Sequence, residues 1–142
     1  MTKILIISAR FYEDLADTME QGARAVLEAA GCEVEVMRVP GAFEIPAAIS
    51  MGCEAEKYDA FVALGCVIRG ETSHYDYVCT ESARGINDIA MALVVPIGYG
   101  ILTVENEAQA WERAALDKGN KGAAAAAAAL VMLENKRSLG LE

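Results

Sequence analysis

Two kinds of hydrophobic pattern alternate along the chain. Residues 3–9 form an isoleucine-rich run, which predicts a strand buried on both faces. Residues 13–30 instead have the period of an amphipathic helix, and Gly31 is a natural end for it. The apolar face of this helix consists of Leu15, Met19, Ala23, Val26 and Ala30.

The same alternation continues through the remaining residues. Further strands are expected at 32–39, 59–65 and 94–103. Helices are expected at 43–55, at 107–116, at 123–136 and in the segment that ends near Leu93. Pro46 is compatible with the helix at 43–55 because it falls in the first turn. Seven alanines at 123–129 predict a helix with a small face that packs closely against its neighbours.

Strands that alternate with helices predict right-handed crossovers and a parallel sheet. We therefore expect one α/β domain over residues 1–142, a flavodoxin-like three-layer sandwich with a four-stranded parallel sheet and helices on both faces. In such sheets ligands bind beyond the carboxyl ends of the strands. The loops after Ala9, Val39, Gly65 and Ile101 are therefore the candidate site.

Composition narrows the possible partners. Apolar residues make up 54% of the 142 residues. A single small core is not expected to bury so much apolar surface, and the part left exposed favours self-association. The net charge of −9 argues against a nucleic-acid partner, so the positive charge for any anionic substrate must be supplied locally.

The spacing of the cysteines and the lengths of the apolar runs indicate whether the chain binds a metal and where in the cell it lies. The four cysteines form no C-x-x-C pair and have no histidine among them, so we expect reduced, mostly buried thiols and no metal site. The N-terminal apolar run is too short for a signal peptide, and no segment is long enough to span a membrane. We therefore expect a cytoplasmic protein with no membrane partner.

The first two loops each fit two roles. Phe11 could stack on a planar heterocycle or staple the helix that follows it. Glu44 lies at a helix start after the Pro40–Gly41 turn, where a carboxylate beside free N–H groups suits a polyol. A carboxylate at this position is also ordinary helix capping.

The segment 64–77 is the most informative. Residues 70–73 (G-E-T-S) precede a helix, so their N–H groups and hydroxyls can bind an anion such as phosphate. His74, the only histidine, is close enough to transfer protons there, although a lone histidine is often structural. Arg113, Lys118 and Lys121 are candidate phosphate ligands, or else solvated cations at helix ends.

Several motifs, taken together, resemble the lumazine synthase family across nearly the whole chain. They are V-P-G-A-F-E-I-P at 39–46, G-C-V-I-R-G-E-T-S-H-Y-D-Y-V at 65–78, V-P-I-G-Y-G-I-L-T at 95–103, Q-A-W-E-R-A at 109–114 and G-N-K-G at 119–122. The resemblance implies condensation of 5-amino-6-(D-ribitylamino)uracil with 3,4-dihydroxy-2-butanone 4-phosphate in riboflavin biosynthesis, without a metal or redox cofactor.

The resemblance also implies a role for each site residue. His74 would move protons, and Glu71, Thr72 and Arg113 would bind the phosphate. Glu71 stands where a small residue is frequent, so its side chain should point to solvent. The uracil and its ribityl chain would contact Phe11, Ala42, Phe43, Glu44, Cys66, Val67 and Ile68. Tyr99 would close the pocket from a neighbouring subunit, with Lys121 nearby.

Assembly follows from the same resemblance. Family members form pentamers with active sites between subunits, and some stack twelve pentamers into shells. The short segment before the first strand and the turn A-A-L-D-K-G-N at 114–120 favour a free homopentamer of about 76 kDa, five times 15.1 kDa. Riboflavin synthase is a further expected partner.

Two other functional classes compete with this one. A non-catalytic flavin- or lumazine-binding protein would need neither His74 nor Arg113. A flavodoxin-like redox protein would have a hydroxyl-rich phosphate loop in place of A-R-F-Y-E-D at 9–14.

Overall fold

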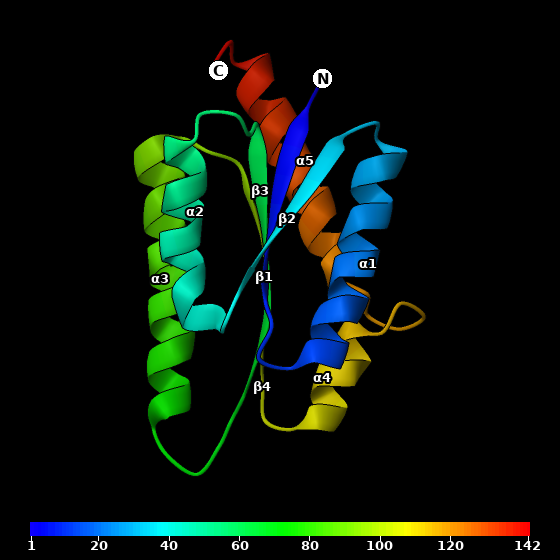
Figure 1. Cartoon of the computed structure of the whole chain (residues 1–142), viewed down its shortest axis with the longest axis vertical. Helices are drawn as coiled ribbons and strands as arrows, with labels where there is room; N and C mark the ends of the chain where they lie inside the picture. The colour runs from blue at the N-terminus through cyan, green and yellow to red at the C-terminus, as the bar shows by residue number, and fades with distance from the viewer.

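A parallel four-stranded sheet lies between two layers of helices (Figure 1). The computed structural model describes residues 1–142. The strands are β1 (Lys3–Ala9), β2 (Glu33–Val39), β3 (Ala60–Ile68) and β4 (Ile97–Val104), in the spatial order β2-β1-β3-β4. The α/β sandwich predicted from the sequence is thereby confirmed.

The helices cover both faces of the sheet. They are α1 (Glu13–Ala29), α2 (Ile45–Glu54), α3 (His74–Leu93), α4 (Glu107–Ala114) and α5 (Lys121–Ser138), and a short 3-10 turn, η1 (Ala42–Glu44), leads into α2. Helices α1, α4 and α5 pack on one face, and α2 and α3 pack on the other (Figure 1). None of these helices is long and apolar enough to cross a membrane.

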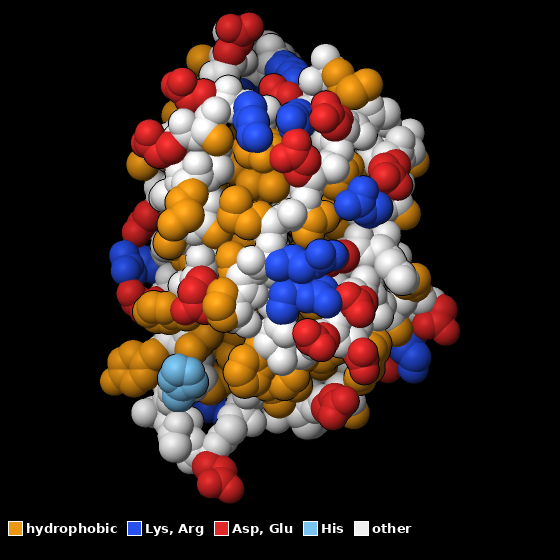
Figure 2. Space-filling model, viewed as in Figure 1, with side chains coloured by type: hydrophobic (Ala, Val, Ile, Leu, Met, Phe, Trp, Pro, Cys, Tyr) orange, Lys and Arg blue, Asp and Glu red, His pale blue; other side chains and the backbone are white.

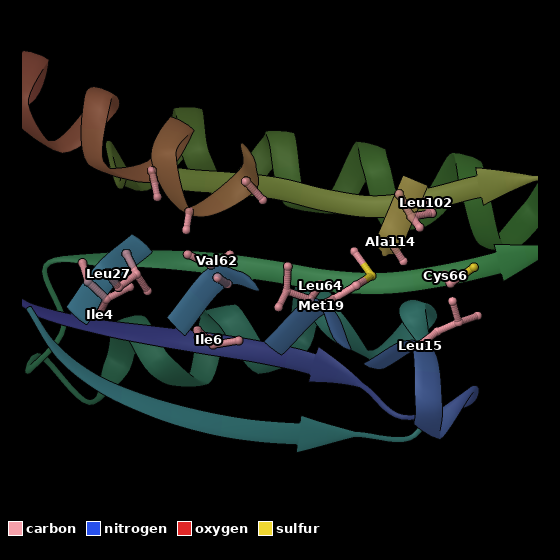
Figure 3. Close-up of a cluster of buried hydrophobic side chains, with 14 of the residues drawn as sticks. Ile4, Ile6, Leu15, Met19, Leu27, Val62, Leu64, Cys66, Leu102 and Ala114 are labelled. Carbon is pink, nitrogen blue, oxygen red and sulfur yellow. The ribbon is translucent and has the colours of Figure 1, made fainter. Parts of the chain in front are cut away.

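Alternate side chains of the central strands enter the two cores. Ile4 and Ile6 of β1, with Val62 and Leu64 of β3, face α1 and α5 (Figure 3). Leu5 and the other intervening residues face α2 and α3. The continuous apolar run at 3–9 is therefore a strand covered on both faces, as expected for a parallel sheet.

Helix α5 lies unusually close to the sheet and to α1. A Cβ on Gly98 of β4 would overlap the carbonyl oxygen of Ala125, and a Cβ on Gly122 would overlap the carbonyl oxygen of Met19. The alanines at 125, 126 and 129 are buried in this contact. The close-packing role predicted for the alanine run is confirmed.

Two strand boundaries differ from the sequence prediction by three residues, and the others agree to within one. β3 continues to Ile68 instead of ending at Gly65, because its pairing with β4 extends to Ile68 opposite Val104. β4 begins at Ile97 instead of at 94, because Val94 adopts φ +53° and caps α3. Cys66, Val67 and Ile68 therefore lie on a strand and not in the loop.

The cysteines are all free thiols. Cys66 is buried, whereas Cys32, Cys53 and Cys79 are only half-buried. The expectation that most of them are buried was therefore wrong: Cys32 and Cys53 lie near helix ends, and Cys79 lies within α3 on a partly exposed face.

Candidate active site

A hollow of about 420 Å³ opens at the carboxyl ends of β1 and β3, a size that suits a small ligand. Three separate loops and the end of β3 contribute to it, as the parallel topology requires. The predicted site residues that line it are Phe11, Ala42, Phe43, Glu44, Cys66, Val67, Ile68, Thr72 and His74.

Phe11 presents its ring to this hollow. The side chain is 72% exposed, which leaves little of it to staple α1. Its ring meets that of Tyr12 edge to face, with the centroids 4.9 Å apart. Phe11 is therefore free to stack on a flat ligand, and Tyr12 restricts its orientation.

Glu44 combines the two roles considered from the sequence. One carboxylate oxygen accepts a hydrogen bond from the backbone N–H of Gly41 at 3.0 Å, which fixes the entry into η1. The same side chain is exposed and lines the hollow. The second carboxylate oxygen remains available to a ligand hydroxyl.

Cys66 forms an apolar part of the wall. Burial, with a smaller contribution from Cys79, raises the pKa of the Cys66 thiol to about 11. The thiol is therefore neutral at physiological pH and a poor nucleophile. Cys66, Val67 and Ile68 together provide an apolar surface at the end of β3.

The loop between β3 and α3 supplies backbone donors. The N–H groups of residues 70–73 have no acceptor within the protein. The Thr72 hydroxyl accepts a hydrogen bond from the His74 N–H at 3.3 Å and so helps to start α3. Free N–H groups before a helix form an anion site.

His74 and Glu71 differ in placement. His74 is exposed and borders the hollow, and Figure 2 shows the single histidine flanked by hydrophobic side chains. Glu71 is exposed and does not line the hollow. Its side chain is therefore not placed to meet a ligand in the hollow.

The remaining predicted residues lie elsewhere. Tyr99, Arg113 and Lys121 line a second hollow of about 320 Å³ along the exposed edge of β4, beside α5. Tyr99 is an exposed aromatic residue on this edge strand. Desolvation raises the pKa of the Tyr99 hydroxyl, which therefore stays protonated.

Two cations in this second hollow have no carboxylate partner. Neither Arg113 nor Lys121 forms a salt bridge, and the Arg113 guanidinium donates only to the carbonyl of Gln109, at 3.0 Å. Lys118, in contrast, lies 3.4 Å from a carboxylate oxygen of Glu112. In a chain of net charge −9, these two unpaired cations are a candidate anion-binding feature.

The structure thus divides the predicted residues between two surfaces of one chain. The first hollow has aromatic and apolar walls, His74 and the free N–H groups. The second has the unpaired cations and Tyr99. No residue lines both hollows.

Besides the Pro40–Gly41 turn, three lining residues were not anticipated from the sequence. Tyr12, Tyr75 and Val78 also face the first hollow. Val78 lies four residues after His74 on α3, so the helical period would have identified it, whereas Tyr75 directly follows His74 and no periodicity indicates it. Tyr12 would have been found from its position directly after Phe11.

Comparison with known proteins identifies the family of this chain. The family model described as 6,7-dimethyl-8-ribityllumazine synthase matches residues 1–137. The chain belongs to this family. The sequence-based recognition of lumazine synthase motifs is therefore confirmed, and the protein is an enzyme of riboflavin biosynthesis.

Individual lumazine synthases match over almost their full length. A 6,7-dimethyl-8-ribityllumazine synthase of Azorhizobium caulinodans is 56% identical, covering 95% of this chain and 86% of its own. The 6,7-dimethyl-8-ribityllumazine synthase 1 of Rhizobium meliloti is 54% identical, over 98% and 94% of the two chains. That of Agrobacterium fabrum is 52% identical, over 96% of each.

Proposed function

We propose that the protein condenses 5-amino-6-(D-ribitylamino)uracil with 3,4-dihydroxy-2-butanone 4-phosphate to form 6,7-dimethyl-8-ribityllumazine, phosphate and water. The observation that carries this proposal is the first hollow, where a ring-binding wall and a phosphate-binding loop lie side by side. Family membership over residues 1–137 supports it.

The uracil occupies the aromatic and apolar part of the hollow. Phe11 stacks on the pyrimidine ring, and Cys66, Val67 and Ile68 form the wall that excludes water from it. Glu44 accepts hydrogen bonds from the ribityl hydroxyls through the carboxylate oxygen that Gly41 leaves free. Ala42 and Phe43 complete this half.

The butanone phosphate occupies the polar part. The free N–H groups of residues 70–73, including those of Glu71 and Thr72, bind the phosphate at the start of α3. Arg113, with Lys121 nearby, adds the positive charge that this acidic chain otherwise lacks. The phosphate is thus held and later released as an anion.

The reaction consists of polar steps that need proton transfers and no electron transfer. The uracil amine attacks the ketone and water leaves, phosphate is then eliminated, and the ribitylamino nitrogen closes the ring with loss of a second water. His74 moves protons at these steps. Most of the acceleration comes from holding both reactants in one orientation.

Because Arg113, Lys121 and Tyr99 lie on a separate surface, the complete site forms where the β4 edge of one subunit meets the first hollow of the next. Such a head-to-tail contact closes into a ring when its rotation allows. The protein is a cytoplasmic homopentamer of a single-domain subunit, with riboflavin synthase as a further partner.

The test mixes purified protein with both substrates and follows lumazine formation by fluorescence. Folded protein that binds lumazine but forms none would instead identify a non-catalytic binding protein. Light scattering during size exclusion tests the assembly, with about 76 kDa expected for five 15.1 kDa chains. A megadalton particle would refute the free pentamer, and an active monomer would refute the shared site.

A further inference from the structure

Arg69, the first residue after β3, joins the ends of three elements. Its backbone N–H donates to the carbonyl of Val104 at 3.0 Å. Its Nε donates to Glu105 Oε1 at 2.8 Å, just beyond β4, and its Nη1 lies 3.4 Å from Asp76 Oδ1 in the first turn of α3. One side chain thus ties the ends of β3 and β4 to the start of α3.

The guanidinium also packs against a residue of the first hollow. It lies 4.3 Å from the centroid of the Tyr75 ring, within the range of a cation–π contact. Tyr75 lines the hollow, whereas Arg69 does not. Arg69 therefore supports the wall from behind and does not touch a ligand.

The loop that follows Arg69 has few other supports. It protrudes beyond the carboxyl edge of the sheet, at the bottom of Figure 1. Its hydrogen bonds are local, from the N–H of His74 to Thr72 Oγ1 and from the N–H of Asp76 to the carbonyl of Ser73. Its position depends on its two ends, and Arg69 connects them.

Simple stabilisation is a weak explanation for these contacts. The Arg69 side chain is 41% exposed, and exposed ion pairs add little to the stability of a fold. The contacts converge instead on the segment that carries the free N–H groups and His74. Small displacements of such groups are costly to catalysis, which depends on orientation.

We propose that Arg69 is a positioning residue, which holds the loop 70–73 and His74 in register with the first hollow through Glu105, Asp76 and Tyr75. The proposal rests on the proposed function for its kinetic consequences. It goes beyond that function, because Arg69 meets neither substrate.

The kinetic test compares Arg69→Gln with Arg24→Gln. Arg24 is a matched control, since its side chain is 43% exposed and pairs with Glu28 on α1, away from both hollows. We expect Arg69→Gln to raise the KM for the butanone phosphate and lower kcat, each about tenfold, because the phosphate loop and His74 shift together. The KM for the uracil should change less than about twofold, since Phe11 and Glu44 remain in place.

Two further variants separate positioning from folding. Arg69→Lys keeps the charge but loses the planar group that reaches both carboxylates, so it should restore activity only in part. Glu105→Gln leaves Arg69 in place and removes the negative charge from its shortest side-chain contact, so it should show the same selective change in KM to a smaller degree.

Amide hydrogen exchange of His74 and Asp76, whose N–H groups are hydrogen-bonded at the start of α3, gives a readout that does not depend on activity. Exchange should be faster in Arg69→Gln than in the natural protein, and unchanged in Arg24→Gln. Equal exchange in all three proteins would overturn the proposal, as would faster exchange with unaltered kinetic constants. Natural protein that forms no lumazine would refute the proposed function instead, and the exchange result would then decide the role of Arg69.

Discussion

Mixing two defective variants should restore activity, because His74 and Arg113 line different hollows of the same chain. His74→Ala alone should slow turnover about tenfold to a thousandfold, since proton transfer is only part of the catalysis. Arg113→Ala alone should raise the KM for the butanone phosphate and leave that for the uracil unchanged.

The expected recovery of activity follows from how many sites in the mixture contain both residues. In the proposed shared site, the first hollow of one subunit combines with the β4 edge of the next. In an equal mixture, half of the first hollows keep His74 and half of the β4 edges keep Arg113. About one quarter of the sites therefore have both residues, whatever the number of subunits in the ring.

The assay unfolds the two variants together, refolds them and measures lumazine formation at a butanone phosphate concentration well below the natural KM. Each variant refolded alone gives the baseline. Recovery to about one quarter of natural activity supports the shared site. A mixture no more active than the mean of its parents, with subunit exchange verified by mass, would show that each chain builds its site alone.

Three further predictions concern charge, packing and pH. In steady-state kinetics, Lys121→Ala should raise the KM for the butanone phosphate about tenfold, because it removes an unpaired cation. Lys118→Ala removes a cation that is paired with Glu112, so it should change this KM by less than about twofold. Gly98→Ala should lower the free energy of unfolding, measured in urea, by about 2–3 kcal/mol, because the added methyl overlaps Ala125. In the control Gly70→Ala the added methyl meets no atom, so the free energy of unfolding should fall by less than about 1 kcal/mol. Burial opposes ionisation of Glu20, but hydrogen bonds from Arg38 and the charge of Arg10 outweigh it and lower the pKa of Glu20 below 4.5. Glu20→Gln should therefore lower the melting temperature above about pH 4.5. The loss should become progressively smaller as the pH falls below that value.

Most of the fold was predictable because local patterns agreed with the tertiary structure. The apolar run at 3–9, the helical period at 13–30 and the alanine run each produced the expected element. The end of β3 was not predictable in the same way. Its last residues are held by pairing with β4, whose own boundary depends on the αL conformation of Val94.

The motifs gave the candidate residues, but they did not show that these residues divide between two hollows. Single-sequence patterns place Arg113 and Lys121 after β4, yet they do not reveal that these cations lie on a different surface from His74. Nor do they reveal that Lys118 is paired while Lys121 is free. The contacts of Arg69 span 36 residues in sequence to Glu105, so only the folded chain brings them together.

Because α5 packs closely against β4, the β4 edge is expected to be stiffer than the loop 70–73. With the Gly98 backbone against Ala125 there is no gap for sliding, so the β4 edge and the start of α5 move as one stiff body. The loop 70–73 has no comparable backing. In the proposed site, any adjustment to an arriving phosphate would therefore fall to that loop, with the β4 edge as the fixed surface.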